Sequence, residues 1–211
     1  MISLKGVSKK FDEDSNIVLK DMEFQDGKSY VLLGASGCGK STLLNMITGV
    51  ITPDSGTIKI DDEEITAMSQ KEKDAFRFKK MGYIFQDFKL MEDMTVLDNL
   101  SILKLGKLDC MSVDEVLDSV GILHKKKSKV KQLSGGEKQR VAIARALMKK
   151  PNIIIGDEPT GNLNYENGKN VVELLMKASK TLAKNVIVVT HDDRLVEFFD
   201  EVIHFEDLLK R

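Results

Sequence analysis

The sequence is poor in cysteine, with only Cys38 and Cys110 among its 211 residues. Its first ten residues, MISLKGVSKK, also lack the apolar run of a secretory signal peptide. Proteins that depend on disulfide bonds in oxidising compartments carry more cysteine and such a signal. We therefore expect the protein to work in the reducing environment of the cytosol.

The sequence also lacks an excess of charge of either sign, since 32 basic residues stand against 33 acidic ones. It therefore has no global electrostatic footprint of the kind that marks nucleic-acid binders, and we expect no direct contact with nucleic acid. Apolar runs are short as well, and none approaches the roughly 18 to 20 residues needed to span a bilayer. Contact with a membrane is expected only through a partner protein.

With 42% hydrophobic residues, the chain can bury one substantial core, and we expect one folded unit. Four short runs are rich in β-branched or aromatic residues. Continuous apolar runs of this length are typical of strands buried on both faces of a parallel sheet. The runs are SYVLLG (residues 29–34), MGYIFQ (81–86), NIIIGDE (152–158) and NVIVVTH (185–191).

Each of these runs ends in a polar or glycine-rich element. Open parallel sheets bind ligands outside the carboxyl ends of their strands. Those ends carry a glycine loop, Gln86, the adjacent Asp157 and Glu158, and His191. We expect these groups to converge on one crevice.

Two other parts of the chain have different patterns. Residues 2–11 and 55–65 alternate more and are broken by glycine and aspartate, which indicates a small antiparallel sheet whose acidic run 61–64 is a solvated turn. Between residues 86 and 132 the pattern becomes helical and indicates an inserted helical lobe. Its clearest apolar stripe consists of Val113, Val116, Leu117 and Val120.

The stretch GASGCGKST fits the phosphate-loop pattern G-x-x-x-x-G-K-[ST], between a predicted strand and the helical TLLNMITG. Its glycines let backbone N–H groups turn towards phosphate oxygens. Lys40 can reach the β- and γ-phosphates and Ser41 can ligate Mg²⁺. A turn without a ligand is the alternative, but the flanking strand and helix favour nucleotide. The expected contacts are Gly34, Ala35, Ser36, Gly37, Cys38, Gly39, Lys40, Ser41 and Thr42.

A second stretch, LSGGEKQRVAIARAL, contains Ser134 and Glu137 at the spacing of a helix capping box. The capping box explains those two residues but not Gly135 and Gly136, which are poor helix formers in the first turn. Glycines there permit an anion to approach the exposed N–H groups. We therefore predict a second phosphate-type site on the same chain.

Together, GASGCGKST, Gln86, LSGGEKQR, IIIGDEPT and His191 resemble, in order and spacing, the nucleotide-binding domain of ABC ATPases over essentially the whole chain. The resemblance implies an α/β P-loop NTPase core with a mainly parallel sheet, an antiparallel β lobe and an inserted helical lobe. The core would comprise residues 1–86 and 151–211 of a single domain, with the helical lobe at 87–150.

The same resemblance implies ATP hydrolysis with Mg²⁺ by a head-to-tail homodimer. In it, Ser134, Gly135 and Gly136 would touch the γ-phosphate bound by the other copy's Lys40.

It also implies individual roles at the strand ends. Asp157 would hold Mg²⁺ and Glu158 would polarise the attacking water. Gln86 would touch both the metal and that water, and His191 would contact the γ-phosphate. Phe11 stands where the family offers a ring to stack on adenine.

More narrowly, residues 36–60, 81–99 and 157–164 are similar to the ATPases of lipoprotein-releasing, macrolide-exporter, peptide-resistance and cell-division systems. These imply an ABC transporter subunit on the cytoplasmic face of a bacterial membrane, beneath a permease with a large external domain. Export or extraction of a substrate and a regulatory switch that controls cell-wall hydrolysis both remain open. Residues 87–97 are our expectation for the permease groove, although simple packing can explain Phe88, Leu90 and Met91.

The sequence departs from the family at Asn164, where aspartate is usual in the loop facing the opposite nucleotide. Asparagine caps a following helix about as well as aspartate does. The departure therefore concerns communication between the two sites more than the local fold.

Overall fold

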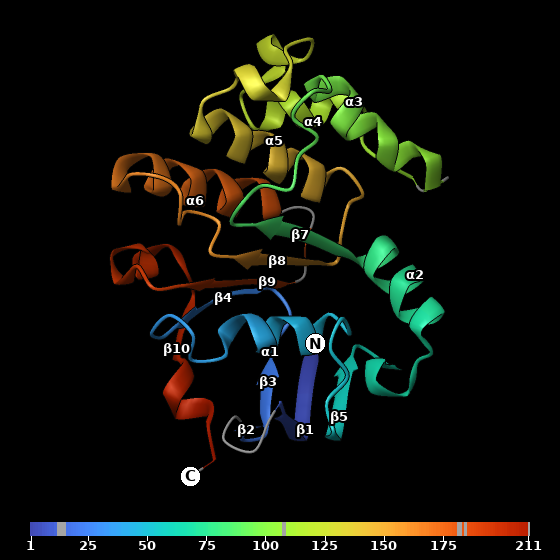
Figure 1. Cartoon of the computed structure of the whole chain (residues 1–211), viewed down its shortest axis with the longest axis vertical. Helices are drawn as coiled ribbons and strands as arrows, with labels where there is room; N and C mark the ends of the chain where they lie inside the picture. Colours follow the sequence, from blue (N-terminus) through green and yellow to red (C-terminus); the bar gives the residue numbers. More distant parts are fainter. Residues whose placement is uncertain (12–15, 107–108, 181–182, 184, 211) are drawn as a thin grey trace.

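The computed structural model describes residues 1–11, 16–106, 109–180, 183 and 185–210. Within these residues the chain forms two five-stranded sheets, one parallel and one antiparallel, together with helices arranged in layers. Figure 1 shows the parallel sheet crossing the middle of the molecule, with one group of helices above it and the antiparallel sheet below.

The central sheet is parallel throughout and has the strand order β10-β4-β9-β8-β7. All four predicted strands are confirmed as neighbours in it. The fifth strand is not evident from the sequence, because its residues alternate between half-buried and exposed and form no apolar run. The strands are β4 (Lys28–Leu33), β7 (Met81–Phe85), β8 (Ile153–Asp157), β9 (Asn185–Thr190) and β10 (Glu201–His204).

The register of these strands brings their carboxyl ends together. Leu33 of β4 pairs with Thr190 of β9. Asp157 of β8 pairs with Val189 on one side and with Phe85 of β7 on the other. The segments that follow the four strands therefore emerge at one edge of the sheet, as expected.

Both faces of the central sheet are buried. Val31 and Leu33 belong to a core shared with α3, α4, α5 and α6, whereas Tyr30 and Leu32 belong to a core shared with α1 and the antiparallel sheet. This double burial explains why the strand sequences are continuously apolar. The helices are α1 (Lys40–Ile47), α2 (Gln70–Lys80), α3 (Val96–Ser101), α4 (Val113–Ser119), α5 (Gly135–Leu147) and α6 (Tyr165–Ser179).

The antiparallel sheet is confirmed. Its long strand pairs with two short strands and with β5. The expected acidic turn, residues 61–64, is only half right. Residues 61 and 62 form the turn, whereas Glu63 and Glu64 form strand β6. The strands are β1 (Ile2–Lys10), β2 (Asn16–Val18), β3 (Met22–Phe24), β5 (Ser55–Ile60) and β6 (Glu63–Glu64).

The predicted helical stretch contains α3, α4 and several 3₁₀ turns, and its apolar stripe is buried. Helix α2 comes earlier in the chain and was not predicted, although its capping box of Ser69 and Glu72 is a readable signal. The 3₁₀ segments are η1 (Ile65–Ala67), η2 (Ile102–Gly106), η3 (Leu123–Lys125), η4 (Val130–Gln132), η5 (Asp193–Phe198) and η6 (Phe205–Leu208). In the described part of the chain, every helix is too short or too polar to cross a membrane.

The close approach of β1 and β5 yields a stability prediction. A Cβ at Gly56 would lie 2.4 Å from the carbonyl carbon and oxygen of Gly6, and its φ of 84° is already left-handed. Gly56→Ala should therefore lower the free energy of unfolding by about 2–5 kcal/mol in urea titrations, from backbone strain plus overpacking.

Gly27→Ala is the matched control, because its φ is 80° but a Cβ there meets nothing within 4 Å. This variant should lower the free energy of unfolding only by the conformational strain, about 1–2 kcal/mol. Equal losses from the two variants would contradict the close-approach argument.

Candidate functional site

The loop between β4 and α1 is shaped to wrap an anion. Gly37 and Gly39 have φ angles of 80° and 113°, which glycine adopts readily. A Cβ at Gly39 would also lie 2.7 Å from Ile17 Cδ1, so a larger residue would have to displace that side chain. The loop leads directly into α1, whose first N–H groups have no partners within the helix. The described geometry therefore suits a phosphate group.

Lys40 lies in the curve of this loop and is only 5% exposed. Its Nζ donates to the carbonyl oxygens of Gly34 at 2.7 Å and Ala35 at 2.8 Å, and it lies 3.9 Å from Cys38 Sγ. The sulfur is a weak acceptor. A phosphate oxygen is a stronger acceptor and can take that place. Both cysteines are free thiols.

A cavity of about 430 Å³ adjoins the loop, and Gly37, Cys38, Gly39 and Thr42 contribute to its wall. Phe11 lines the same cavity and is 51% exposed. An exposed ring beside a phosphate-binding loop is available to stack on a nucleotide base.

The Asp157 carboxylate is held by the hydroxyl group of Ser41. Ser41 Oγ donates to Asp157 Oδ1 at 2.9 Å. Burial raises the pKa of Asp157, against the opposing effect of the Ser41 hydrogen bond. Burial and the charge of Asp157 raise the pKa of Tyr83, so its phenol keeps its proton at neutral pH. A carboxylate in this setting gains from a nearby cation.

Glu158 has a strained backbone, with a φ of 46° that is uncommon for a residue with a side chain. Its N–H donates to the carbonyl oxygen of Val189 at 3.0 Å, which ties the strained residue to β9. Its side chain is 15% exposed, and Oε2 lies 2.7 Å from Nδ1 of His191. Because an ionised carboxylate only accepts, His191 supplies the hydrogen of this contact.

Gln86 emerges at the same edge but is exposed. Its carbonyl oxygen accepts a hydrogen bond from Asn162 Nδ2 at 2.8 Å, and its side chain packs on Gly161. Among the described residues, no hydrogen bond joins the Gln86 side chain to Asp157 or Glu158. Gln86 is therefore held close to Asp157 and Glu158 by its contacts with the loop that follows Glu158.

The glycine pair of the second motif lies in a different cavity. Ser134 caps α5 in the predicted box: its Oγ accepts from the N–H of Glu137 at 3.3 Å. A cavity of about 430 Å³ there is lined by residues 134–137 and by the loop that contains Asn164. A Cβ at Gly136 would meet nothing within 4 Å, so packing within this chain does not require glycine. Lys40 does not line this cavity.

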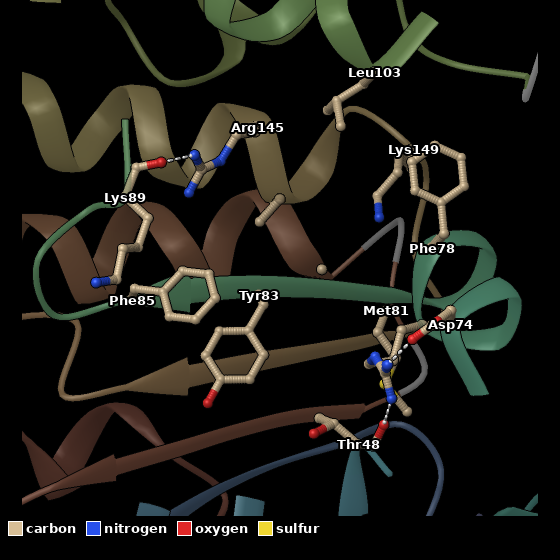
Figure 2. A pocket seen from close by; sticks show the side chains of 13 residues that line it. Thr48, Asp74, Phe78, Met81, Tyr83, Phe85, Lys89, Leu103, Arg145 and Lys149 are labelled. Carbon is tan, nitrogen blue, oxygen red and sulfur yellow. Dashed lines mark hydrogen bonds and ion pairs between the residues drawn. The ribbon is translucent and has the colours of Figure 1, made fainter. Parts of the chain in front are cut away.

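A third cavity, of about 520 Å³, lies between β7, α2 and α5 (Figure 2). We call it the β7 groove. Its apolar lining consists of Phe78, Met81, Tyr83, Phe85, Leu103 and Ala146. Its charged lining consists of Asp74, Arg77, Lys89, Arg145 and Lys149.

Sequence reasoning missed Tyr83 and most of the groove. The expected groove segment, residues 87–97, supplies only Lys89 to this lining. Arg145 instead holds the carbonyl oxygens of Phe88 and Lys89, two residues with positive φ. The available signal for Tyr83 is its hydroxyl within an apolar strand, since a buried phenol requires a partner.

In this structure a strand, a glycine-rich anion loop and a helix follow one another along the chain. A carboxylate at the end of a neighbouring strand accepts a hydrogen bond from Ser41. These features define a P-loop nucleotide hydrolase. The chain belongs to the ABC transporter family, whose model matches residues 19–161. It is an ATP-hydrolysing subunit of an ABC transporter, which acts together with a membrane permease.

Among its relatives is the lipoprotein-releasing system ATP-binding protein LolD of Pseudoalteromonas translucida, 37% identical over 98% of this chain and 93% of that protein. LolD of Bacteroides fragilis is 36% identical over 98% of both. The dimeric bacterial ABC transporter cassette MJ0796 has a TM-score of 0.85 at 34% identity, covering 100% of this chain and 97% of that one. A post-hydrolysis dimer of that cassette with ADP and Pi gives 0.84 at 34% identity, covering 99% and 94%.

The position of Glu158 yields a prediction about turnover. Glu158→Gln keeps the size of the side chain but removes its basicity, so ATP hydrolysis should fall about 10²- to 10⁴-fold while ATP affinity is retained. Phosphate release and nucleotide binding measure the two effects. The exposed Glu197 serves as control, since Glu197→Gln should leave both unchanged. If Glu158→Gln hydrolyses ATP at the wild-type rate, Glu158 takes no part in the hydrolysis reaction.

Proposed function

We propose that two copies of this chain hydrolyse MgATP at shared sites on the cytoplasmic face of a bacterial membrane. They drive a permease with a large external domain in the release or extraction of lipoproteins. The names of the relatives support lipoprotein release over a regulatory switch without transport. The observation that carries the shared-site proposal is the separation of the glycine pair, Gly135 and Gly136, from the cavity beside Lys40.

Within each copy, residues 34–42 hold the phosphates and Phe11 stacks on adenine. Glu158 orients the attacking water and His191 contacts the γ-phosphate. A single domain, with residues 87–150 as a helical lobe, carries these groups. The geometry that supports these roles is the convergence of four strand ends, with Glu158 and His191 in contact.

Mg²⁺ fits the donors present on this chain. Ser41 and Asp157, already bonded to each other, would hold it together with Gln86. No group of three or more His, Cys, Asp or Glu residues able to hold a metal occurs in the described residues. Few protein ligands suit Mg²⁺, which is held in phosphate sites by one or two side chains and the substrate's own oxygens. Bound there, the ion neutralises phosphate charge.

The glycine pair would complete the ATP site of the other copy. Ser134 and both glycines stand at the amino end of α5, where N–H groups and the helix dipole favour an anion. Each cavity is therefore half of a site, and a head-to-tail dimer joins the halves.

A substitution at Gly136 should change two measurements in opposite directions, the stability of the monomer and the formation of the dimer. Because a Cβ there is unopposed within the chain, Gly136→Ala should leave the monomer folded and stabilise it by up to about 1 kcal/mol. The methyl group should block the approach of the partner's nucleotide. In a Glu158→Gln background, which retains ATP, the dimer seen by size-exclusion chromatography should then be lost. A stable ATP dimer of Glu158→Gln with Gly136→Ala would contradict the shared site.

We infer that the β7 groove receives the cytoplasmic segment of the permease. Lys149 is the strongest indication, because burial lowers the pKa of its ammonium group. The group lies 4.8 Å above the Phe78 ring, and no carboxylate of the described residues pairs with it. Figure 2 shows this pair at one end of the groove. A segment with an acidic side chain and apolar neighbours matches such a lining.

The matched test compares two adjacent lysines. Lys149→Glu reverses the unpaired charge and should weaken association with a co-expressed permease about tenfold or more, measured by co-purification in detergent. ATPase activity of the isolated ATPase should be retained.

Lys150→Glu is the control, because Lys150 lies outside the groove and its Nζ pairs with the exposed Asp109 at 2.8 Å. It should leave association intact. Equal association by both variants would exclude the groove as the docking site.

A further inference from the structure

The direction of the His191 ring depends on the backbone that carries it. The side chain is 57% exposed, and the hydrogen bond described for its ring goes to Glu158 Oε2 at 2.7 Å. An exposed ring stays in one direction only if the residues around it are themselves held in place. The question is therefore what holds residues 190–194, which we call the His191 segment.

The His191 segment is held on both sides of the histidine. The N–H of Asp192 donates to Oγ1 of the buried Thr190 at 3.1 Å, a bond that spans His191. Arg194 holds the Asp192 carboxylate with two side-chain hydrogen bonds, from Nε at 2.7 Å and from Nη2 at 2.8 Å. A bidentate pair of this kind fixes the plane of the carboxylate as well as its distance.

The ion pair between Arg194 and Asp192 contributes more to geometry than to stability. The side chain of Arg194 is 60% exposed, and exposed ion pairs add little to the free energy of unfolding. Substitution of Arg194 should therefore leave the protein folded, so that an effect on the nucleotide site can be measured.

Arg194 also rests on a different element of the fold. Its guanidinium carbon lies 4.5 Å from the centroid of the Tyr165 ring, and Tyr165 is the first residue of α6. Tyr165 is half-buried and packs against the apolar core in which Leu195 is buried. The ring is thus a fixed support for the guanidinium group, and it fastens the His191 segment to the start of α6.

A second contact of the same kind joins α6 to η5 further along both elements. Here the cation belongs to α6 and the ring to η5: Lys169 Nζ lies 5.8 Å from the centroid of the Phe198 ring. This contact is further from His191 along the chain and provides an internal comparison for the first.

We propose that Arg194 is a positioning residue that keeps His191 directed at the γ-phosphate, by holding Asp192 while it rests on Tyr165. This inference rests on the proposed role of His191, through which Arg194 acts. Tyr165 directly follows Asn164, which lines the cavity of the glycine pair. The direction of His191 is thereby tied to the loop that faces the partner's nucleotide in the proposed dimer.

Arg194→Met removes the charge and both side-chain hydrogen bonds but keeps an unbranched side chain. Phosphate release at saturating ATP should fall about two- to fivefold, the ratio that corresponds to one exposed cation–π contact. Affinity for ADP, which lacks the γ-phosphate, should be unchanged. The His191 ring should become more mobile in NMR relaxation of its ring carbons. The chain has three histidines, so these signals can be assigned by comparison with His191→Ala.

Two substitutions of Tyr165 test the support. Tyr165→Phe keeps the ring and should behave as wild type. Tyr165→Leu removes the ring and should lower turnover and mobilise His191, as Arg194→Met does. In the Arg194→Met background it should have little further effect, because both changes act through one contact. Additive losses would overturn the link between Arg194 and Tyr165.

Lys169→Met is the matched control. It removes the cation of the second contact between α6 and η5 and leaves the His191 segment intact. Turnover and the mobility of the His191 ring should stay at the wild-type level. Equal changes in Lys169→Met and Arg194→Met would indicate a general loosening of η5 and would overturn the positioning role.

His191→Ala separates this proposal from the one on which it rests. If His191→Ala hydrolyses ATP at the wild-type rate, the proposed role of His191 is itself wrong. If it loses turnover while Arg194→Met keeps the turnover and ring mobility of wild type, only the role of Arg194 is wrong.

Discussion

Burial of the central strands on both faces is the constraint on which the rest of the structure depends. Because the apolar residues of β4, β8 and β9 alternate between the two cores, a shift of register by one residue would exchange those cores. The strands are thereby locked, and so are the segments that leave their ends. The alignment of the anion loop with Asp157 therefore follows from the strand register that this apolar packing specifies.

Strand β7 connects two regions of the molecule. Its carboxyl end contributes Gln86 to the edge that carries the nucleotide site, and its side chains form much of the groove wall. Arg145 of α5 binds the carbonyl oxygens of the loop just after that end. Since α5 begins at the glycine pair, it connects that pair to the groove and, through Arg145, to the loop at the carboxyl end of β7.

Much of this arrangement could be predicted because the responsible signals are local. The phosphate loop, the capping box at Ser134 and the four apolar runs each depend on residues close together in the chain. Strand β10 and the positive φ of Glu158 could not be predicted, because both are imposed by neighbours distant in sequence. The groove residues come from α2, β7, α5 and the segments beside them, so spacing along the chain indicates nothing about their proximity.

Asn164 accepts a hydrogen bond from the N–H of Asn167 and caps α6, as the sequence predicts. Both amides line the cavity of the glycine pair, where Glu137 and Arg140 balance each other in formal charge. An anion entering this cavity therefore meets no net charge and is attracted by the amide dipoles of α5. Attraction by dipoles acts over a short range and is less sensitive to dissolved salt than attraction between exposed charges. If two copies associate through this cavity as proposed, asparagine at this position is expected to make their association less sensitive to changes in ionic strength.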